Sequence, residues 1–268
     1  MKLWGLLALG YLLMLCAQAQ DNEERLPGWQ GETHSVARSI AEKSQERRMW
    51  VEPLSWEPRA SVLHNFLTDD ECDHLVEAAR PNMKRSTVVD SKTGQSVDST
   101  VRTSSGTFLM RGQDEIVRAV EERIAKVTFI PVSHGEGFQI LHYEHGQKYE
   151  PHTDWFDAAS DVNEMHTRNG GQRLATMLLY LTDVEEGGET VFPAAHDSID
   201  VNRPGFDQLS ECGRRGPSVK PKKGDALLFW SLTPEAKPDS RSLHGGCPVL
   251  KGSKWSATKW LRVHEYSI

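Results

Sequence analysis

His152 and Asp154 stand two residues apart in the segment 149–155. In an extended strand, residues i and i+2 point to the same face with their Cα atoms roughly 6.6 Å apart, so this imidazole and this carboxylate can converge on one metal ion. Two protein ligands hold an ion weakly, and we expect His244, in the segment 242–248, to be the third. Two histidines and one carboxylate on one side of a metal leave the opposite side open, as in non-haem Fe(II) oxygenases. A zinc hydrolase is less favoured, because nothing supplies an obvious general base beside the metal.

Lys254 is a candidate for a buried cation. It stands next to Trp255 at the expected start of a strand, ten residues after His244. A lysine in such a place normally extends its ammonium to water. If the ammonium points into the fold instead, it needs a buried anion. A dicarboxylate cosubstrate that chelates the metal with one end would supply this anion with the other.

Composition places the chain among ordinary soluble globular proteins. Its 268 residues suffice for one sizeable domain and a targeting segment, and 38% are hydrophobic and 26% charged. The net charge is −7 and the basic residues are scattered rather than clustered. This pattern argues against a nucleic acid or an anionic membrane as the partner.

The N-terminus has the pattern of a secretory signal peptide. Lys2 precedes an apolar run over residues 3–16, and residues 17–19 form an A-x-A cleavage site. The alternative is a membrane anchor, but the run is shorter than the ~20 apolar residues that a bilayer span needs. We therefore expect a signal peptide over 1–19, a polar linker over 20–50 and one domain over 51–268. A cleaved signal implies the secretory pathway, in the endoplasmic reticulum or Golgi lumen.

Three cysteines remain once the signal peptide and Cys16 are removed. In an oxidising compartment this odd number suggests one disulfide and one spare thiol. Cys72 lies in a helical pattern, so we assign it as the buried spare. Cys212 and Cys247 are then the predicted pair.

The pattern of apolar residues predicts helices first and strands later. Residues 62–66 alternate as a strand would, and Thr68 with Glu71 forms a capping box that starts a helix ending at Pro81. A second helix is predicted over 114–126, and the polar segment 90–100 reads as a hairpin tip or flap.

After residue 137 the sequence changes to short strands separated by turns. The predicted strands span 138–143, 173–181, 189–192, 225–230, 243–247 and 255–263. We expect long polar loops over 161–172 and 202–218, which in a compact domain are often binding loops. The predicted class is α+β and mainly β, an antiparallel jelly roll flanked by N-terminal helices.

Several segments match the pattern of one family. They are Arg102–Ser104, Glu136–Gln139, Gln147–Asp154, Gly170–Arg173, Val184–Pro193, Lys223–Leu227 and His244–Trp260. On these residues the chain, from about residue 51 to its end, resembles the prolyl 4-hydroxylases, which are 2-oxoglutarate- and Fe(II)-dependent dioxygenases. The similarity is greatest to the short plant and green-algal type. The resemblance implies a double-stranded β-helix.

The resemblance also implies roles for individual residues. His152, Asp154 and His244 would be the catalytic ligands of Fe(II), and Lys254 would pair with the distal carboxylate of 2-oxoglutarate. Tyr143 and Thr190 would assist Lys254 through their hydroxyls. Relatives such as lysyl hydroxylases have arginine in place of the lysine, and halogenating relatives lack the carboxylate ligand. The residues present therefore favour hydroxylation of proline, with release of succinate and CO₂.

The implied substrate is a proline-rich peptide in the polyproline II conformation, such as a cell-wall glycoprotein. Such a rod is usually held by aromatic faces and a few polar side chains. The aromatic candidates are Tyr149 and Trp260, and the polar candidates are Arg102, Ser104, Glu136 and Arg173. We expect L-ascorbate as the reductant that restores the iron, a monomer, and membrane attachment only if the N-terminal segment is not cleaved. Two alternatives stay open: a hydroxylase of another residue, and a non-catalytic jelly-roll binding protein.

Overall fold

The computed structural model describes residues 48–89, 96–98, 101–157, 161–197, 201–202 and 205–267. The predicted signal peptide over 1–19 and most of the predicted linker over 20–50 lie outside these residues. None of the helices in the described part combines the length and the apolar character that a bilayer crossing requires.

An antiparallel sheet of eight strands forms the centre of the domain. In spatial order its strands are β1 (Trp50–Trp56), β2 (Arg59–His64), β13 (Ala226–Trp230), β9 (Arg173–Tyr180), β16 (Lys254–Arg262), β7 (Phe138–Tyr143), β6 (Ser105–Leu109) and β3 (Lys84–Arg85). Apart from β1 with β2 and β6 with β7, strands next to one another are not consecutive in the sequence, so residues far apart in the chain share one face. The sheet therefore gathers side chains that no local segment could bring together.

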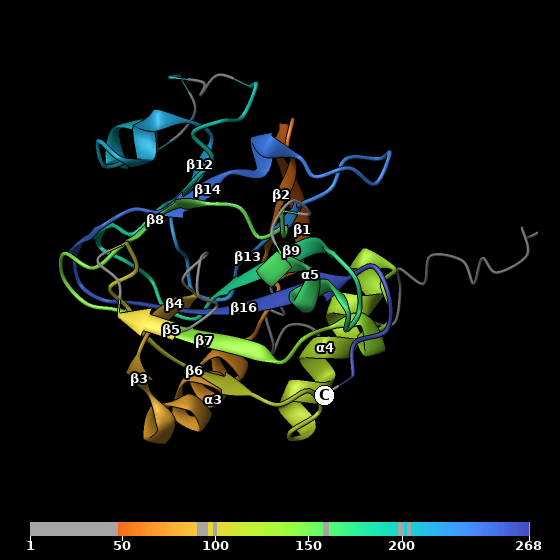
Figure 1. Ribbon diagram of the computed structural model, residues 1–268. Coiled ribbons are helices and arrows are strands. Elements are labelled where there is room, and N and C mark those ends of the chain that lie inside the picture. Colours follow the sequence, from red (N-terminus) through yellow and green to blue (C-terminus); the bar gives the residue numbers. More distant parts are fainter. Residues whose placement is uncertain are drawn as a thin grey trace, which may run out of the picture. The chain divides into compact units, whose positions relative to one another are not determined.

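A smaller antiparallel sheet lies over one face of the large one (Figure 1). Its strands, in spatial order, are β12 (Ser218–Val219), β11 (Thr190–Val191), β14 (His244–Gly246) and β8 (Tyr149–His152). Two further pairs are β10 (Glu186–Gly187) with β15 (Val249–Lys251), and β4 (Thr87–Val89) with β5 (Ser96–Asp98). The two facing sheets enclose the space in which a site can form.

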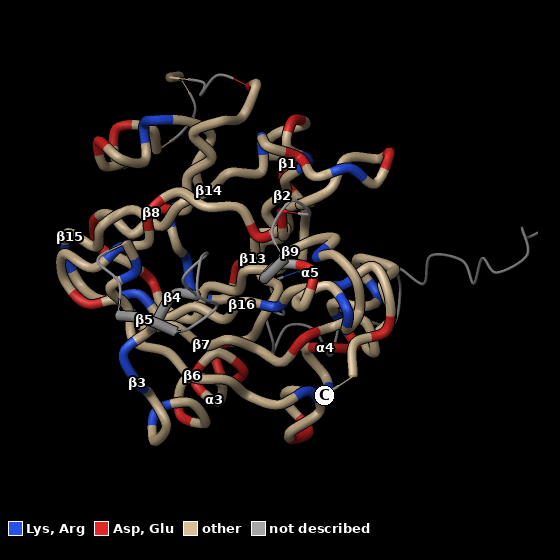
Figure 2. Tube along the Cα trace, viewed as in Figure 1, with Lys and Arg blue, Asp and Glu red and all other residues tan. Residues whose placement is uncertain are grey.

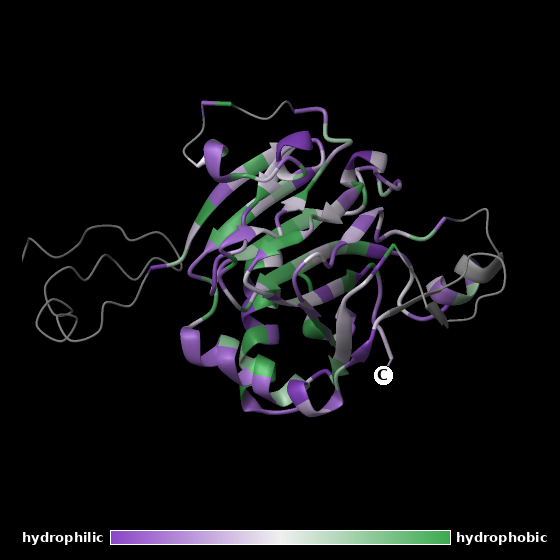
Figure 3. Cartoon of the chain, turned by 90° about the vertical axis from the view of Figure 1, so that its left-hand side faces the viewer, coloured by the Kyte–Doolittle hydropathy of each residue, from purple (hydrophilic) through white to green (hydrophobic). Residues whose placement is uncertain are grey.

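Helices α3 (Asp69–Ala79) and α4 (Glu115–Thr128) cover the opposite face of the large sheet (Figure 1). The predicted capping box starts α3, since Thr68 Oγ1 accepts from Glu71 N and Glu71 Oε2 accepts from Thr68 N. Asp114 caps α4, and Phe129 ends it in the left-handed region. Apolar residues of both helices pack on the sheet in the main core, which is visible as the hydrophobic strands and inner helix faces of Figure 3.

Side chains along β9 and β16 point alternately to the two faces of the large sheet, and the two faces differ in chemistry. Met177 and Leu179 belong to the core under the helices, whereas Thr176 and Leu178 line a pocket on the other side. On β16, Lys254, Ser256, Thr258 and Trp260 likewise line this pocket. The face toward the smaller sheet is thus the one that lines the pocket.

Several predictions of secondary structure are confirmed and others are corrected. The segment 161–172, predicted as a loop, begins with helix α5 (Asp161–Thr167), and the segment 202–218 contains two short 3₁₀ helices, η3 (Phe206–Gln208) and η4 (Gly213–Arg215). The 3₁₀ helices η1 (Arg80–Asn82), η2 (Val132–His134) and η5 (Ser240–Ser242) complete the elements. Strands β1, β3, β6, β10, β12 and β15 were not predicted. The hairpin around 90–100 is confirmed by the pairing of β4 with β5, and its tip lies outside the described residues.

The disulfide between Cys212 and Cys247 is present, with Cα atoms 5.7 Å apart, and Cys72 is a buried free thiol. Both predictions about the cysteines are confirmed. Acidic and basic residues are interspersed along the described trace (Figure 2), as the scattered charges of the sequence indicate.

A buried ion pair in the core gives a test of the packing between helix and sheet. Lys259 of β16 and Glu121 of α4 are each about 2% exposed, and Lys259 Nζ donates to Glu121 Oε1. Glu121→Ala leaves the ammonium buried without its partner and should lower the free energy of unfolding by about 3–5 kcal/mol. Urea denaturation measures this change. The double variant Glu121→Leu/Lys259→Met should recover most of the loss, and an unaltered midpoint in Glu121→Ala would contradict the packing described.

Candidate active site

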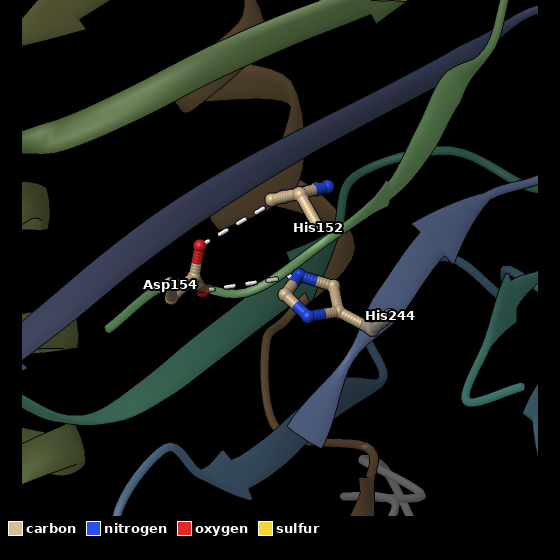
Figure 4. A group of neighbouring side chains, drawn as sticks. All are labelled: His152, Asp154 and His244. Atoms are coloured by element: carbon tan, nitrogen blue, oxygen red, sulfur yellow. Dashed lines mark ion pairs between the residues drawn. The ribbon is translucent and has the colours of Figure 1, made fainter. Parts of the chain in front are cut away.

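The smaller sheet holds the two predicted histidine ligands directly opposite each other. His152 is the last residue of β8 and is paired in register with His244 of β14. Their ring centroids are 4.4 Å apart. Asp154 follows two residues later, beyond the end of β8 rather than within it, which corrects the expectation that both residues share one strand. The turn after His152 brings the carboxylate beside both imidazoles, with one oxygen toward each histidine (Figure 4).

The donor atoms of these three residues lie close enough together to be candidate ligands of one metal ion. They all lie within 4.8 Å of one another. Asp154 Oδ1 is 3.8 Å from His152 Nε2, and Asp154 Oδ2 is 3.8 Å from His244 Nε2. Ligands at right angles on one ion, with bonds of about 2.0–2.2 Å, have donor atoms about 3 Å apart, so these side chains must move roughly 1 Å closer together to hold a metal. All three approach from one side, as a facial triad does.

Hydrogen bonds to the far side of each ligand fix its direction. The Nδ1 atoms of His152 and His244 lie 2.9 and 3.0 Å from the carbonyl oxygens of Glu150 and Ser242. A carbonyl only accepts, so Nδ1 carries the proton and Nε2 keeps its lone pair for a metal. Thr176 Oγ1 donates to Asp154 Oδ2 at 2.6 Å and holds the carboxylate. Such partners fix the direction of metal ligands in proteins.

Burial and charge favour the protonation states that metal binding needs. Burial, followed by the charge of His244, lowers the pKa of His152 to about 3, so its imidazole is neutral at neutral pH. Burial alone would raise the pKa of Asp154, but the neighbouring imidazoles, Arg173 and the Thr176 hydroxyl hold it below its ordinary value. A neutral histidine and an ionised carboxylate are the forms that coordinate metals.

Lys254 points into the pocket and not to water. Its side chain is buried, and Nζ donates to the carbonyl oxygen of Gly188 at 2.8 Å. Nζ also lies 5.5 and 5.7 Å from the ring centroids of Tyr143 and Tyr180. Burial lowers the pKa of Lys254 to about 8, and the charge of Glu189 opposes the shift. A buried ammonium with so few partners is suited to receive an anion.

The two predicted helpers of Lys254 line the same pocket. Tyr143 is directly opposite Lys254 in the pairing of β7 with β16, and burial raises the pKa of its hydroxyl. Thr190 is buried on β11, where its Oγ1 accepts from the Tyr180 hydroxyl at 2.9 Å. Both hydroxyls are therefore placed to share a ligand with the ammonium.

The predicted aromatic contacts of the substrate, Tyr149 and Trp260, also line the pocket. The Tyr149 ring stacks on His152 with centroids 3.7 Å apart, and the guanidinium carbon of Arg102 lies 4.8 Å from the Tyr149 ring centroid. Trp260 is covered by the guanidinium of Arg173, whose carbon is 3.6 Å from the ring centroid. The aromatic surface and the metal ligands are thus continuous.

The four polar candidates are placed around the pocket and do not line it in the described structure. They are Arg102, Ser104, Glu136 and Arg173. Arg102 donates to Gln139 Oε1 at 2.8 Å, and Arg173 forms two bonds to Glu136. Ser104 is fully buried and bonds to Ser86, so direct contact with a ligand requires movement. These residues are brought together near the pocket, but Ser104 is the least accessible.

Sequence patterns missed several residues that the structure places in the pocket, and two of them form hydrogen bonds with predicted site residues. Thr176 holds Asp154, and Gln139 joins Arg102 to the pocket lining. The signal that could have found Thr176 is alternation, because its neighbours Ala175 and Met177 belong to the core face of β9.

Comparison with known proteins gives the family. Residues 138–262 match the model of the 2OG-Fe(II) oxygenase superfamily. A probable prolyl 4-hydroxylase 10 of Arabidopsis thaliana is 62% identical over 238 residues, which cover 87% of this chain and 80% of the relative. Prolyl 4-hydroxylase 5 of the same plant is 61% identical over 219 residues, covering 82% and 73%.

Solved structures agree with the fold. The chain is similar to a viral collagen prolyl hydroxylase of Paramecium Bursaria Chlorella virus-1, with 28% identity, a TM-score of 0.53, and coverage of 76% of this chain and 95% of the other. A prolyl hydroxylase of Trichoplax adhaerens, at 15% identity and a TM-score of 0.50, covers 76% and 83% and agrees in fold. The predicted double-stranded β-helix is confirmed. The chain belongs to the prolyl 4-hydroxylase family of 2-oxoglutarate- and Fe(II)-dependent oxygenases.

Proposed function

We propose that the protein hydroxylates C4 of peptidyl proline with Fe(II), 2-oxoglutarate and O₂, releasing succinate and CO₂. The observation that carries this function is that one pocket holds both a one-sided His-Asp-His group and a buried ammonium, in a chain of this family. The two imidazoles, the ionised carboxylate and the lysine each suit one part of the Fe(II)–2-oxoglutarate pair.

In this proposal His152, Asp154 and His244 hold Fe(II), while Lys254, Tyr143 and Thr190 hold the distal carboxylate of 2-oxoglutarate. Bound Fe(II) and 2-oxoglutarate supply the oxidising chemistry as the keto acid is decarboxylated. The residues of the chain orient both groups and exclude water from the pocket. Asp154 also occupies a position on the metal that would otherwise accept an exogenous anion.

The polar surroundings suit a proline-rich peptide. Proline has no N–H, and a polyproline II segment makes no internal hydrogen bonds, so its carbonyl oxygens seek donors. Arg102 Nε and Trp260 Nε1 are buried N–H donors that have no hydrogen-bond partner in the described structure. We propose that they bind carbonyl oxygens of the peptide, with Tyr149 as the aromatic face and Arg173, Glu136 and Ser104 as the polar surroundings.

We extend the proposal to the setting of the enzyme. The signal-like segment 1–19, followed by a linker over 20–50 and a catalytic domain over 51–268, favours the endoplasmic reticulum or Golgi lumen. The Cys212–Cys247 disulfide supports an oxidising compartment. Proline-rich secreted proteins of the cell-wall type are then the substrates, L-ascorbate restores the iron, and the enzyme acts as a monomer.

The function is tested by incubating the protein with Fe(II), 2-oxoglutarate and a proline-rich peptide. We expect one oxygen atom added per hydroxylated proline, located at C4 by NMR, with an equal amount of succinate. His152→Ala should form neither product, since two ligands hold the metal poorly. Oxygen gained at another residue would identify a different hydroxylase. Peptide binding without turnover, unchanged by His152→Ala, would identify a non-catalytic binding protein.

Thr176→Val tests the support of the carboxylate ligand. The variant keeps the shape of the side chain but removes the bond to Asp154 Oδ2, so affinity for Mn(II), used in place of Fe(II), should fall about tenfold. Titration followed by electron paramagnetic resonance measures this. Thr128→Val is the matched control, because its buried hydroxyl bonds to Ile124 O within α4. Equal Mn(II) affinities in all three proteins would refute the role given to Thr176.

The lowered pKa of Lys254 leads to a prediction of how 2-oxoglutarate binding depends on pH. Its pKa in the free protein is about 8, so the ammonium that pairs with the carboxylate is lost as the pH rises above this value. Calorimetry on the Mn(II)-loaded protein should show the Kd rising about tenfold between pH 7 and pH 9. Lys254→Arg keeps its charge at both pH values, so its Kd should change little. A parallel rise in both proteins would show that another group titrates.

A further inference from the structure

Arg262 ends β16, two residues beyond Trp260, and its side chain is buried. Its guanidinium bonds in two directions. Nε donates to Glu136 Oε1 at 2.7 Å, and Nη1 donates to the carbonyl oxygens of His166 and Gly171 at 3.0 and 2.7 Å. The donors of a guanidinium are spread over three nitrogens in one plane and so reach a carboxylate and backbone carbonyls on different edges, whereas the three donors of a lysine ammonium radiate from a single atom.

The Glu136 carboxylate is shared between two guanidinium groups. Arg173 donates to Oε1 from Nε at 2.8 Å and to Oε2 from Nη2 at 3.1 Å. This geometry fixes the plane of the Arg173 guanidinium, which lies against the Trp260 ring. Because Arg262 bonds to the same Oε1, it determines where the carboxylate sits and thereby where Arg173 points.

A second route from Arg262 to Arg173 runs through the backbone. Gly171, whose carbonyl accepts from Arg262, precedes Arg173 by two residues, and Gln172 O accepts from Val263 N at 3.0 Å. At Gly170, a Cβ would fall 3.1 Å from Arg262 Cγ, and the φ of +76° also favours glycine. The chain entering β9 is thus packed closely against the arginine. Both the main chain and the side chain of Arg173 depend on Arg262.

We propose that Arg262 is a positioning residue for the peptide, which it serves by holding Arg173 against Trp260. This inference rests on the proposed function, in which Trp260 and Arg173 form part of the peptide site. Arg262 itself touches neither peptide nor 2-oxoglutarate. Its loss therefore weakens peptide binding and leaves the binding of 2-oxoglutarate intact, because Lys254 lies at the other end of β16, opposite Tyr143 of β7.

The test compares Arg262→Lys, Arg173→Lys and the double variant with the unsubstituted protein. Binding of a synthetic proline-rich peptide and of 2-oxoglutarate is measured by calorimetry on the Mn(II)-loaded proteins. Arg123→Lys is the matched control, since Arg123 likewise bonds to a carboxylate, of Glu71, and to a backbone carbonyl, of Phe66. It joins α4 to α3 on the opposite face of the large sheet. Arg262→Gln replaces Arg262→Lys if the lysine variant does not fold.

We expect Arg262→Lys to weaken peptide binding about tenfold or more, as a small misplacement of a binding group does. Affinity for 2-oxoglutarate should stay within about twofold, and the KM for the peptide should rise while kcat changes little. Arg123→Lys should leave both affinities unchanged. The double variant should bind peptide no more weakly than Arg173→Lys alone, because Arg262 acts through Arg173.

The inference is overturned if Arg262→Lys binds peptide normally, if the losses of the two single variants add, or if affinity for 2-oxoglutarate falls in parallel. Failure of the unsubstituted protein to bind the peptide is a different result. It removes the proposed function together with this inference, whereas normal peptide binding in both proteins removes the inference alone.

Discussion

The pairing of β8 with β14 is the constraint on which the site depends. It places His152 opposite His244, and because side chains alternate along a strand, a slip of one residue would turn one imidazole away from the other. Other residues of the site come from the facing sheet, where Thr176 of β9 holds Asp154 and Lys254 of β16 supplies the ammonium. Neither sheet alone carries the site. The fold matters to function because it holds the two sheets face to face.

Much of the fold could be predicted because its signals are local. The capping box at Thr68 and Glu71 marks the start of α3, and the predicted strand 138–143 matches β7 in full. Other elements owe their form to contacts with distant residues. Strand β6 contains Gly106, which disfavours a strand by itself, but an added Cβ would lie 2.8 Å from Leu141 Cδ2 and 2.9 Å from Ile140 O. The close approach of β7 explains this glycine, and no pattern within β6 reveals it.

The site likewise contains residues that the sequence identifies and residues whose roles only the fold reveals. The types and spacing of the metal-ligand candidates are visible in the sequence, because ligands must be histidine or carboxylate and must be near in space. The residues that orient them are ordinary threonines, glutamines and arginines whose roles depend on sheet register. Arg262 shows this most clearly, since its partners Glu136, His166 and Gly171 lie about ninety residues or more away along the chain. Sequence patterns therefore identify the metal-ligand candidates more readily than the residues that hold them in place.

The central claim is that one pocket holds a ferrous ion on three side chains and a five-carbon keto diacid between this ion and Lys254. Anomalous diffraction at the iron edge, from crystals grown without oxygen in the presence of Fe(II) and 2-oxoglutarate, tests it most directly. The account predicts a single strong peak about 2.0–2.2 Å from Nε2 of His152, Nε2 of His244 and one oxygen of Asp154. It also predicts ligand density that ends at Lys254 Nζ. A peak elsewhere, or a keto acid whose distal carboxylate avoids Lys254, would contradict it.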